Sequence, residues 1–153
     1  MVRLAIPLTK DRIAWVDEND FDRVMQFKWI AWTKRGLWYA HSNLVGYMHC
    51  FILGRTGIDH KDRNGLNNVR DNLRDATTQQ NGRNRSFTNS NHYKGVKRNG
   101  KKFGARIQID VGQSLWLGSA TDPVTAAKMY DEAAIKHFGE FANLNFPKEV
   151  SHR

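Results

Sequence analysis

Asp59 and His60 are neighbours at the end of a short apolar stretch, and together they offer a carboxylate and an imidazole. Hydrolysis of a phosphodiester near neutral pH needs a base that activates water and a cation that stabilises the charged phosphate. An imidazole has a pKa of about 6.5 and suits the base, whereas Mg²⁺ prefers oxygen ligands such as a carboxylate. On an extended strand the two side chains point to opposite faces, so they could serve different partners around one phosphate.

The charge around this pair favours a polyanion as partner. Residues 60–106 hold 12 of the 24 Lys and Arg but 3 of the 15 Asp and Glu, so the whole net charge of +9 lies in this segment. Lys and Arg placed along phosphates release condensed counterions, which is the basis of salt-dependent binding to nucleic acid. A basic surface that only aids solubility is the alternative that charge alone leaves open.

The run from Ile58 to Thr77, followed by Gln-Gln and then Asn81, resembles the HNH family of nucleases. In that family two strands and a helix form a ββα-metal fold around one divalent ion, with the first histidine as general base. The resemblance implies that His60 is the base, that Asp59 and Asn81 bind the metal, and that Asn72 braces the loop that holds the base.

The expected metal is Mg²⁺ or Mn²⁺. Asn81 stands at the third position of the motif, where the family name has a histidine, and an amide oxygen suits a hard ion better than zinc. Cys50 is the single cysteine, which excludes a multi-cysteine zinc site. Four arginines stand where a contact to phosphate would be useful: Arg70, Arg74, Arg83 and Arg85.

Beyond residue 91 the pattern changes to a small sheet followed by a helix. Strands are expected at 95–98, 103–109 and 114–117, joined by turns at Asn99-Gly100 and Val111-Gly112. Asp122 and Pro123 form a typical helix start and Gly139 can end that helix, whose inward face would consist mostly of small residues.

This second segment resembles an AP2 DNA-binding domain in its His-Tyr-Lys-Gly-Val start at His92, its Leu-Trp-Leu-Gly strand around Trp116, its alanine-rich helix and its Asn-Leu-Asn-Phe-Pro end at Pro147. In that family a three-stranded sheet enters the major groove of DNA. The resemblance implies DNA contacts from Lys94, Lys97, Arg98, Lys102, Arg106, Gln108 and Trp116, with Arg83 and Arg85 joining them from the preceding linker. Trp116 has a packed aromatic as its structural alternative, and Gln108 stands where relatives often carry arginine.

Residues 1–45 read as short strands, at 4–8, 13–16, 27–32 and 37–41, and Trp29, Trp32 and Trp38 are expected in their core. Residues 47–54 fit a short helix or a buried strand, which periodicity does not decide. A helix is expected from Val69 through Gln80.

The predicted fold class is therefore α+β. A β-rich front leads into a ββα-metal nuclease motif over residues 1–81, a basic polar linker spans 82–91, an AP2-like domain with a three-stranded antiparallel sheet packed on one helix spans 92–147, and 148–153 form a tail.

The whole chain resembles a phage-type HNH homing endonuclease. The resemblance implies an enzyme that cuts double-stranded DNA with a preference for certain sites and acts as a monomer. It also implies that the protein lies in the cytoplasm of a bacterial host and has no membrane partner. Two alternatives stay open. One is a DNA-binding regulator on a nuclease-like scaffold that does not cut, and the other is a nucleoid protein without sequence preference.

Overall fold

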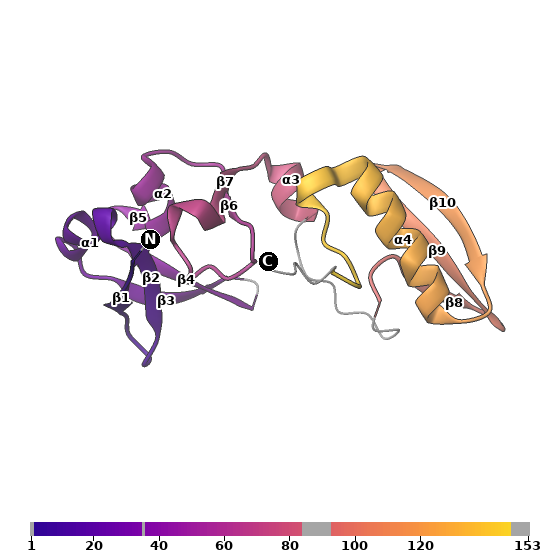
Figure 1. The fold of residues 1–153 in the computed structure, drawn as a ribbon, viewed down its shortest axis with the longest axis horizontal. Coiled ribbons are helices and arrows are strands. Elements are labelled where there is room, and N and C mark those ends of the chain that lie inside the picture. The colour runs from indigo at the N-terminus through magenta and orange to yellow at the C-terminus, as the bar shows by residue number, and fades with distance from the viewer. Residues whose placement is uncertain (1, 35, 84–92, 148–153) are drawn as a thin grey trace. The chain divides into compact units, whose positions relative to one another are not determined.

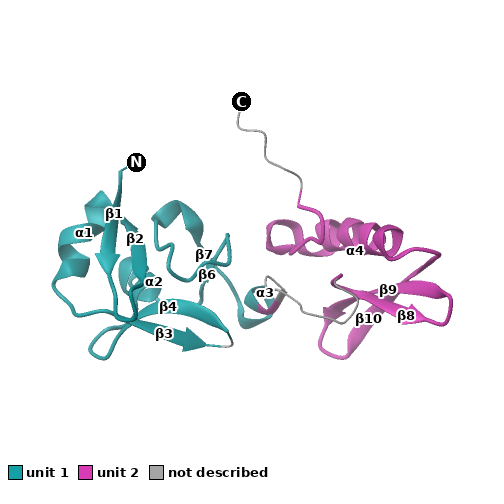
Figure 2. Ribbon diagram, turned by 90° about the horizontal axis from the view of Figure 1, so that it is seen from below, with its two compact units in different colours: residues 1–81 teal, residues 82–153 magenta. Residues whose placement is uncertain are grey.

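A computed structural model describes residues 2–34, 36–83 and 93–147 of the chain (Figure 1). The chain divides into two compact units, residues 1–81 (unit 1) and 82–153 (unit 2), which are coloured separately in Figure 2. The predicted linker falls almost entirely outside the described residues, as do Arg85 and the tail from residue 148.

Unit 1 begins with an antiparallel strand pair and a helix. The strand β1 (Arg3–Pro7) pairs with β2 (Ile13–Asp17), and α1 (Glu18–Met25) follows directly. A three-stranded sheet comes next, with the order β3 (Ile30–Lys34), β4 (Leu37–Ser42) and β5 (Gly46–Tyr47). The predicted strands of this front are confirmed, except that the one expected from residue 27 begins at Ile30, and α1 was not expected.

The core of unit 1 forms where the alternating apolar residues of these strands meet the helices. Ala14 and Val16 are fully buried on one face of β2, together with Val24 of α1 and Ile52 of the next helix. Trp29 is 4% exposed and its indole N–H donates to the Val24 carbonyl at 2.8 Å, so its predicted core position is confirmed.

Trp32 is 48% exposed on β3, and the prediction that it lies in the core is wrong. Trp38 is half-buried under the cations of Lys10 and Arg12, at 5.2 and 4.3 Å from its ring centroid. Trp32 shares its face of the hairpin with Tyr39 and His41, whereas the buried Ala31 and Ala40 lie on the other face.

The second half of unit 1 is a hairpin between two helices. The helix α2 (Met48–Leu53) precedes β6 (Ile58–His60), which pairs antiparallel with β7 (Leu73–Asp75), and α3 (Thr78–Arg83) follows. Residues 47–54 are thus helical from Met48. A 3-10 turn, η1 (Arg70–Asn72), leads into β7.

The expected helix from Val69 through Gln80 is wrong, because η1 and β7 occupy residues 70–75 and the α-helix α3 begins only at Thr78. Leu73 is 6% exposed and lies opposite His60 in the β6–β7 pair. Pairing with a strand more than ten residues earlier decides the conformation here, and local helix propensity does not reveal such pairing.

Unit 2 is a three-stranded antiparallel sheet with one long helix. The strand order is β10 (Gln113–Ala120), β9 (Lys102–Asp110), β8 (Val96–Asn99), and α4 (Pro123–Phe138) packs on all three strands. The helix starts as predicted, since the Asp122 carboxylate accepts the Thr125 N–H at 2.8 Å and a proline occupies the first turn. Gly139 ends it, followed by the 3-10 turn η2 (Gly139–Phe141).

The interface between α4 and the sheet is made of small side chains, as the sequence predicts. Ala126, Ala127 and Ala134 are fully buried and pack against Val96 and Ala105 of the sheet or beside Ile107. Removing such apolar area from water stabilises the fold by about 25 cal/mol per Å². The contacted set on β9 is Ala105 and Ile107, which fixes Arg106 and Gln108 on the opposite face.

The C-terminal part of unit 2 is tied back to α4 by a buried carboxylate. Asp131 is 7% exposed and accepts the backbone N–H groups of Asn145 and Phe146, both at 2.8 Å. The Asn145 side chain in turn accepts the Lys94 N–H at 2.6 Å and donates to the Lys94 carbonyl at 3.1 Å. This network fixes the start of β8 against the end of the chain segment after α4.

The α+β fold class with small antiparallel sheets is confirmed. Among the described residues, no helix is long and apolar enough to cross a membrane.

Candidate functional site

The β6–β7 hairpin places Asp59 and His60 side by side inside unit 1. Their exposed fractions are 7% and 4%, so neither is an ordinary surface side chain. Asp59 lies across from Arg74 of β7, whereas His60 lies across from Leu73. The short strand thus turns the carboxylate and the imidazole to different neighbours.

Asp59 makes a cross-strand ion pair with Arg74. Its Oδ2 accepts hydrogen bonds from Nη2 at 2.9 Å and from Nε at 3.2 Å, and both side chains are less than a tenth exposed. Arg74 is therefore held inside the unit by the carboxylate.

Arg70 is also held by a carboxylate. Its Nε and Nη2 bind the two oxygens of Asp20 at 2.7 and 2.8 Å, and its backbone N–H donates to Asp17 at 2.7 Å. Asp20 is 2% exposed and also pairs with Arg23. These bonds attach the entry of β7 to α1. Of the remaining arginines of this set, Arg83 ends α3 and Arg85 lies outside the described residues.

His60 is oriented by Asn68, a fully buried residue. Nε2 of His60 lies 3.1 Å from Oδ1 of Asn68. An amide oxygen can only accept, so the imidazole donates through Nε2–H and the neutral ring carries its lone pair on Nδ1. Burial lowers the pKa of His60 from its ordinary 6.5, and the hydrogen bond to Asn68 opposes that shift. The ring is thus unprotonated near neutral pH and can accept a proton.

Asn72 closes the loop between β6 and β7. Its Oδ1 accepts the Asp62 N–H at 3.0 Å, and its Nδ2 donates to the Asp62 carboxylate at 2.9 Å and to the Asn67 carbonyl at 2.7 Å. Its backbone carbonyl also accepts the Lys61 N–H at 2.8 Å. One side chain therefore joins Asp62 and Asn67, which lie on either side of the turn in the loop that contains Asn68.

Gly65 lets the same loop pack on β4. A Cβ at this position would stand 2.4 Å from the Trp38 carbonyl oxygen and from the ring of Tyr39. The Tyr39 ring in turn lies 6.1 Å from the ring of His60, centroid to centroid. A side chain at residue 65 would push the loop away from β4 and from the Tyr39 ring, which lies beside His60.

A second histidine, His49 of α2, packs edge-to-face on His60 with ring centroids 4.7 Å apart. It is 7% exposed, and its Nδ1 has no hydrogen-bond partner among the described residues. Burial lowers the pKa of His49 to about 3, with smaller contributions from His60 and Lys34. His49 is therefore uncharged and leaves His60 as the imidazole of this pair that can take a proton.

Asn81 lies on α3, where it is exposed and its backbone N–H donates to the Thr77 carbonyl at 2.9 Å. Within the described residues, no three His, Cys, Asp or Glu side chains gather as a metal site. A carboxylate from Asp59 and an amide from Asn81 are oxygen donors, and Mg²⁺ commonly binds through one or two carboxylates while it keeps several waters. The chemistry of this donor pair fits Mg²⁺ or Mn²⁺ and not zinc.

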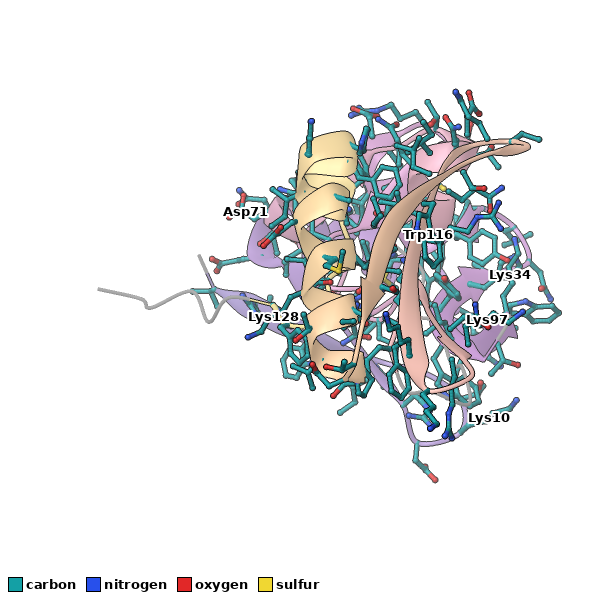
Figure 3. All side chains as sticks on the ribbon, turned by 90° about the vertical axis from the view of Figure 1, so that its right-hand side faces the viewer. Lys10, Lys34, Asp71, Lys97, Trp116 and Lys128 are labelled. Carbon is teal, nitrogen blue, oxygen red and sulfur yellow. The ribbon has the colours of Figure 1, made fainter. Side chains whose placement is uncertain are left out.

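On unit 2 the sheet presents an exposed face opposite α4. By strand alternation Lys97, Lys102, Arg106 and Gln108 share this face, and Trp116 pairs with Arg106 from the neighbouring strand. Figure 3 shows Lys97 and Trp116 on the side of the sheet away from α4, and Lys128 on the other side of that helix. Trp116 is 63% exposed, so the alternative of a packed core aromatic is wrong.

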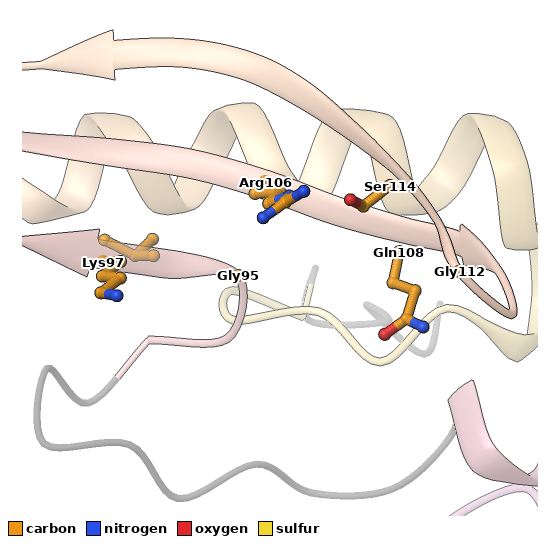
Figure 4. Close-up of a pocket in the computed structure, with 7 residues that line it drawn as sticks. Gly95, Lys97, Arg106, Gln108, Gly112 and Ser114 are labelled. Atoms are coloured by element: carbon orange, nitrogen blue, oxygen red, sulfur yellow. The ribbon is translucent and has the colours of Figure 1, made fainter.

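One of the expected DNA-contacting residues, Arg98, lies on the other face of the sheet. Arg98 belongs to the alternate set of β8, and its Nε donates to the Gly100 carbonyl at 3.2 Å within the hairpin. Lys94 precedes β8 and is half-buried, with its backbone held by Asn145. A hollow of about 370 Å³ lies on the face and is shown in Figure 4; its lining includes Lys97, Arg106, Gln108, Ser114 and the glycines 95 and 112.

Over 88 residues the chain is 39% identical to an uncharacterized HNH endonuclease of Acanthamoeba polyphaga mimivirus. The match includes 58% of this chain and 46% of that protein, so the chain spans less than half of its relative's length. No protein-family model matches the chain.

Two residues in contact with His60, Asn68 and His49, were not predicted as site residues from the sequence, and neither was Asp20, the partner of Arg70. Asn68 follows His60 by eight residues in a loop rich in Asn and Asp, and such loops fold back on themselves through side-chain hydrogen bonds. That spacing is the one signal that could have indicated Asn68, whereas Asp20 is distant in sequence from its partner Arg70 and gave no signal.

Proposed function

We propose that the chain is an endonuclease of the HNH class that hydrolyses phosphodiester bonds in double-stranded DNA. The observation that carries the proposal is the buried His60, whose Nε2 is held by Asn68 and which lies next to Asp59 on a hairpin followed by a helix. The name of the mimivirus relative supports the same class of activity.

His60 serves as the general base in this proposal. With the Nε2 proton committed to Asn68, the Nδ1 lone pair accepts the proton of the attacking water. The lowered pKa of His60 keeps this nitrogen unprotonated at neutral pH, and the uncharged His49 beside it does not compete for the proton. Asn72 acts at a distance, since its hydrogen bonds hold the loop that carries Asn68.

Asp59 and Asn81 would hold one divalent ion, Mg²⁺ or Mn²⁺. Such an ion, when bound, supplies positive charge at the scissile phosphate and at the leaving 3′ oxygen. Arg74 compensates the Asp59 carboxylate inside the unit, so the hairpin can bury this acid before the site is complete.

We further propose that the exposed sheet face of unit 2 binds DNA and gives the enzyme its site preference, as in a homing endonuclease acting as a monomer. Lys97, Lys102 and Arg106 supply positive charge on this face, and Trp116 adds an exposed aromatic surface. A nuclease domain of low selectivity that is joined to a separate DNA-binding domain would cut at a distance from the sequence that the second domain recognises.

A plasmid-nicking assay with the full chain in Mg²⁺ tests the proposal. The wild type should nick supercoiled plasmid, and His60→Ala should reduce the rate by at least about 100-fold, because general-base catalysis typically contributes that much. His137→Ala, which changes an exposed histidine on α4, is the matched control and should cut normally. Equal nicking by His60→Ala and the wild type would remove His60 as the base.

The second candidate is a DNA-binding regulator that does not cut. The basic sheet face favours it as much as it favours the nuclease, since binding needs no catalytic residue. Tight DNA binding by the wild type with no cutting in Mg²⁺ or Mn²⁺ would establish the regulator.

A further inference from the structure

The hollow on the exposed face of unit 2 contains an amide among cations. Lys97 and Arg106 contribute positive charge, and Gln108 lies on the same face of β9, two residues beyond Arg106 (Figure 4). No acidic side chain is among the described residues that line the hollow. Arg106 and Gln108 differ in chemistry, because the guanidinium of arginine only donates hydrogen bonds, whereas the amide of glutamine both donates and accepts.

This difference matters for the kind of atom that each residue can meet. A phosphate oxygen only accepts hydrogen bonds. An amide can therefore use its N–H donors there but not its oxygen, whereas all the polar groups of Lys and Arg are donors. In the major groove, adenine offers an acceptor at N7 beside a donor at N6, and a glutamine amide matches both. Guanine offers two acceptors, at N7 and O6, and an arginine matches those.

Strand geometry fixes the distance between Arg106 and Gln108 along β9. Residues at i and i+2 of an antiparallel strand are about 6.8 Å apart, since the rise is about 3.4 Å per residue. Successive bases along one strand of B-DNA are also about 3.4 Å apart. Arg106 and Gln108 therefore match positions two base-pair steps apart when β9 runs along the groove.

The neighbours on β10 leave the end of Gln108 accessible. Ser114 is the register partner of Gln108 and is small, while the large Trp116 pairs with Arg106 instead. Gln108 is exposed. A base edge can thus approach the amide without displacing an aromatic ring.

We propose that Gln108 recognises an adenine and Arg106 a guanine, so that the site bound by unit 2 carries these two purines separated by one base pair. This inference rests on the proposed binding of DNA by the sheet face. It assigns a base preference to Gln108, the amide that lies among the cations of this hollow.

The test is selection from randomised duplex DNA by the full chain carrying His60→Ala, so that bound DNA is not cut. The selected sequences should contain an A·T pair two steps from a G·C pair. Gln108→Arg should change the adenine position to guanine, by about 10-fold or more in relative affinity, the discrimination that one bidentate contact provides. Gln113→Arg adds the same charge at the end of the β9–β10 hairpin and should leave the adenine preference unchanged.

Gln108→Ala gives a second readout at an exposed position where folding should not suffer. It should lose the adenine preference and keep the guanine. Selection of a sequence whose preferences are unaltered by both changes at residue 108 would overturn the inference while DNA binding stands. Failure of the parent chain to bind any duplex would instead overturn the DNA-binding part of the proposed function.

Discussion

Unit 1 places its polar chemistry inside, whereas unit 2 places it on an open face. In unit 1 the buried polar residues include Asp20, Asp59, His60 and Asn68, and each has hydrogen bonds to other side chains of the unit. In unit 2 the helix-facing core is mainly Ala, Val and Ile, with the candidate DNA-contacting side chains on the opposite face.

The difference predicts how each unit responds to change. A buried polar group that loses its partner destabilises the fold by about 1–3 kcal/mol, and more where a charge is left unpaired. A side chain on an exposed face can be replaced with little effect on folding. Substitutions at the candidate cutting site should therefore alter stability and activity together, whereas those on the sheet face of unit 2 should alter binding alone.

The largest effect on stability is expected from Asp20→Ala. This change removes the carboxylate that binds Arg70 and Arg23, and the free energy of unfolding should fall by about 3 kcal/mol. Urea denaturation measures the loss, and hydrogen exchange should locate it in residues 1–81. Asp22→Ala, which removes an exposed acid of the same helix, is the control and should change stability by less than about 0.5 kcal/mol. Equal stability of the two variants would contradict the role of Asp20 as an internal tie.

Asp131→Ala should destabilise unit 2 by about 2 kcal/mol, because it leaves the backbone N–H groups of Asn145 and Phe146 without their acceptor. Hydrogen exchange of those two amides gives the measurement. Glu132→Ala, at an exposed position one residue further along α4, is the matched control. Unchanged protection of both amides would show that unit 2 needs no buried carboxylate and would make the contrast with unit 1 complete.

His49 predicts how stability depends on pH. The folded pKa of about 3 lies below the ordinary 6.5, so between these values the unfolded chain binds a proton that the folded chain does not. Stability should consequently fall as pH drops below 6.5, by about 1–2 kcal/mol from pH 7 to 5 for this group.

His49→Phe removes this contribution and keeps a ring against His60. Thermal or urea unfolding at pH 7 and pH 5 should therefore show a smaller loss in the variant than in the wild type. Identical losses would mean that His49 is protonated in the folded protein.

The smallest effect is expected from Lys97→Ala on the sheet face. It should leave folding unchanged and reduce the salt dependence of DNA binding by about one counterion, because a single phosphate contact is lost. Lys128→Ala removes an exposed lysine on the other side of α4 and should leave the salt dependence as it was (Figure 3). The same salt dependence of DNA binding in the two variants would contradict the proposal that this face binds DNA.

The parts of the fold that the sequence predicts are those specified locally. The start of α4 at Asp122-Pro123, its end at Gly139 and the Asn99-Gly100 turn depend on side chains within a few residues of each other. The strand β7 and the helix α1 were missed, because β7 forms by pairing with β6 and α1 is anchored by Arg70, fifty residues away.

The same distinction applies to the candidate site. Asp59, His60, Asn72 and Asn81 were selected by spacing within a motif, whereas the contact of His49 with His60 depends on how α2 packs against the hairpin. Whether a given arginine faces solvent or a carboxylate is also a tertiary property. This is why Arg70 and Arg74 could be named from the sequence, whereas their pairing with Asp20 and Asp59 could not.

Gly104 sets the level of the exposed sheet face. A Cβ at this residue would come within 2.4 Å of the indole of Trp116, so the ring lies directly over the backbone of β9. A single hydrogen atom in place of a methyl group thus lets the bulkiest side chain of the face lie low across the sheet instead of standing above it. The contour that any partner of this face meets is decided by a residue that has no side chain with which to touch that partner.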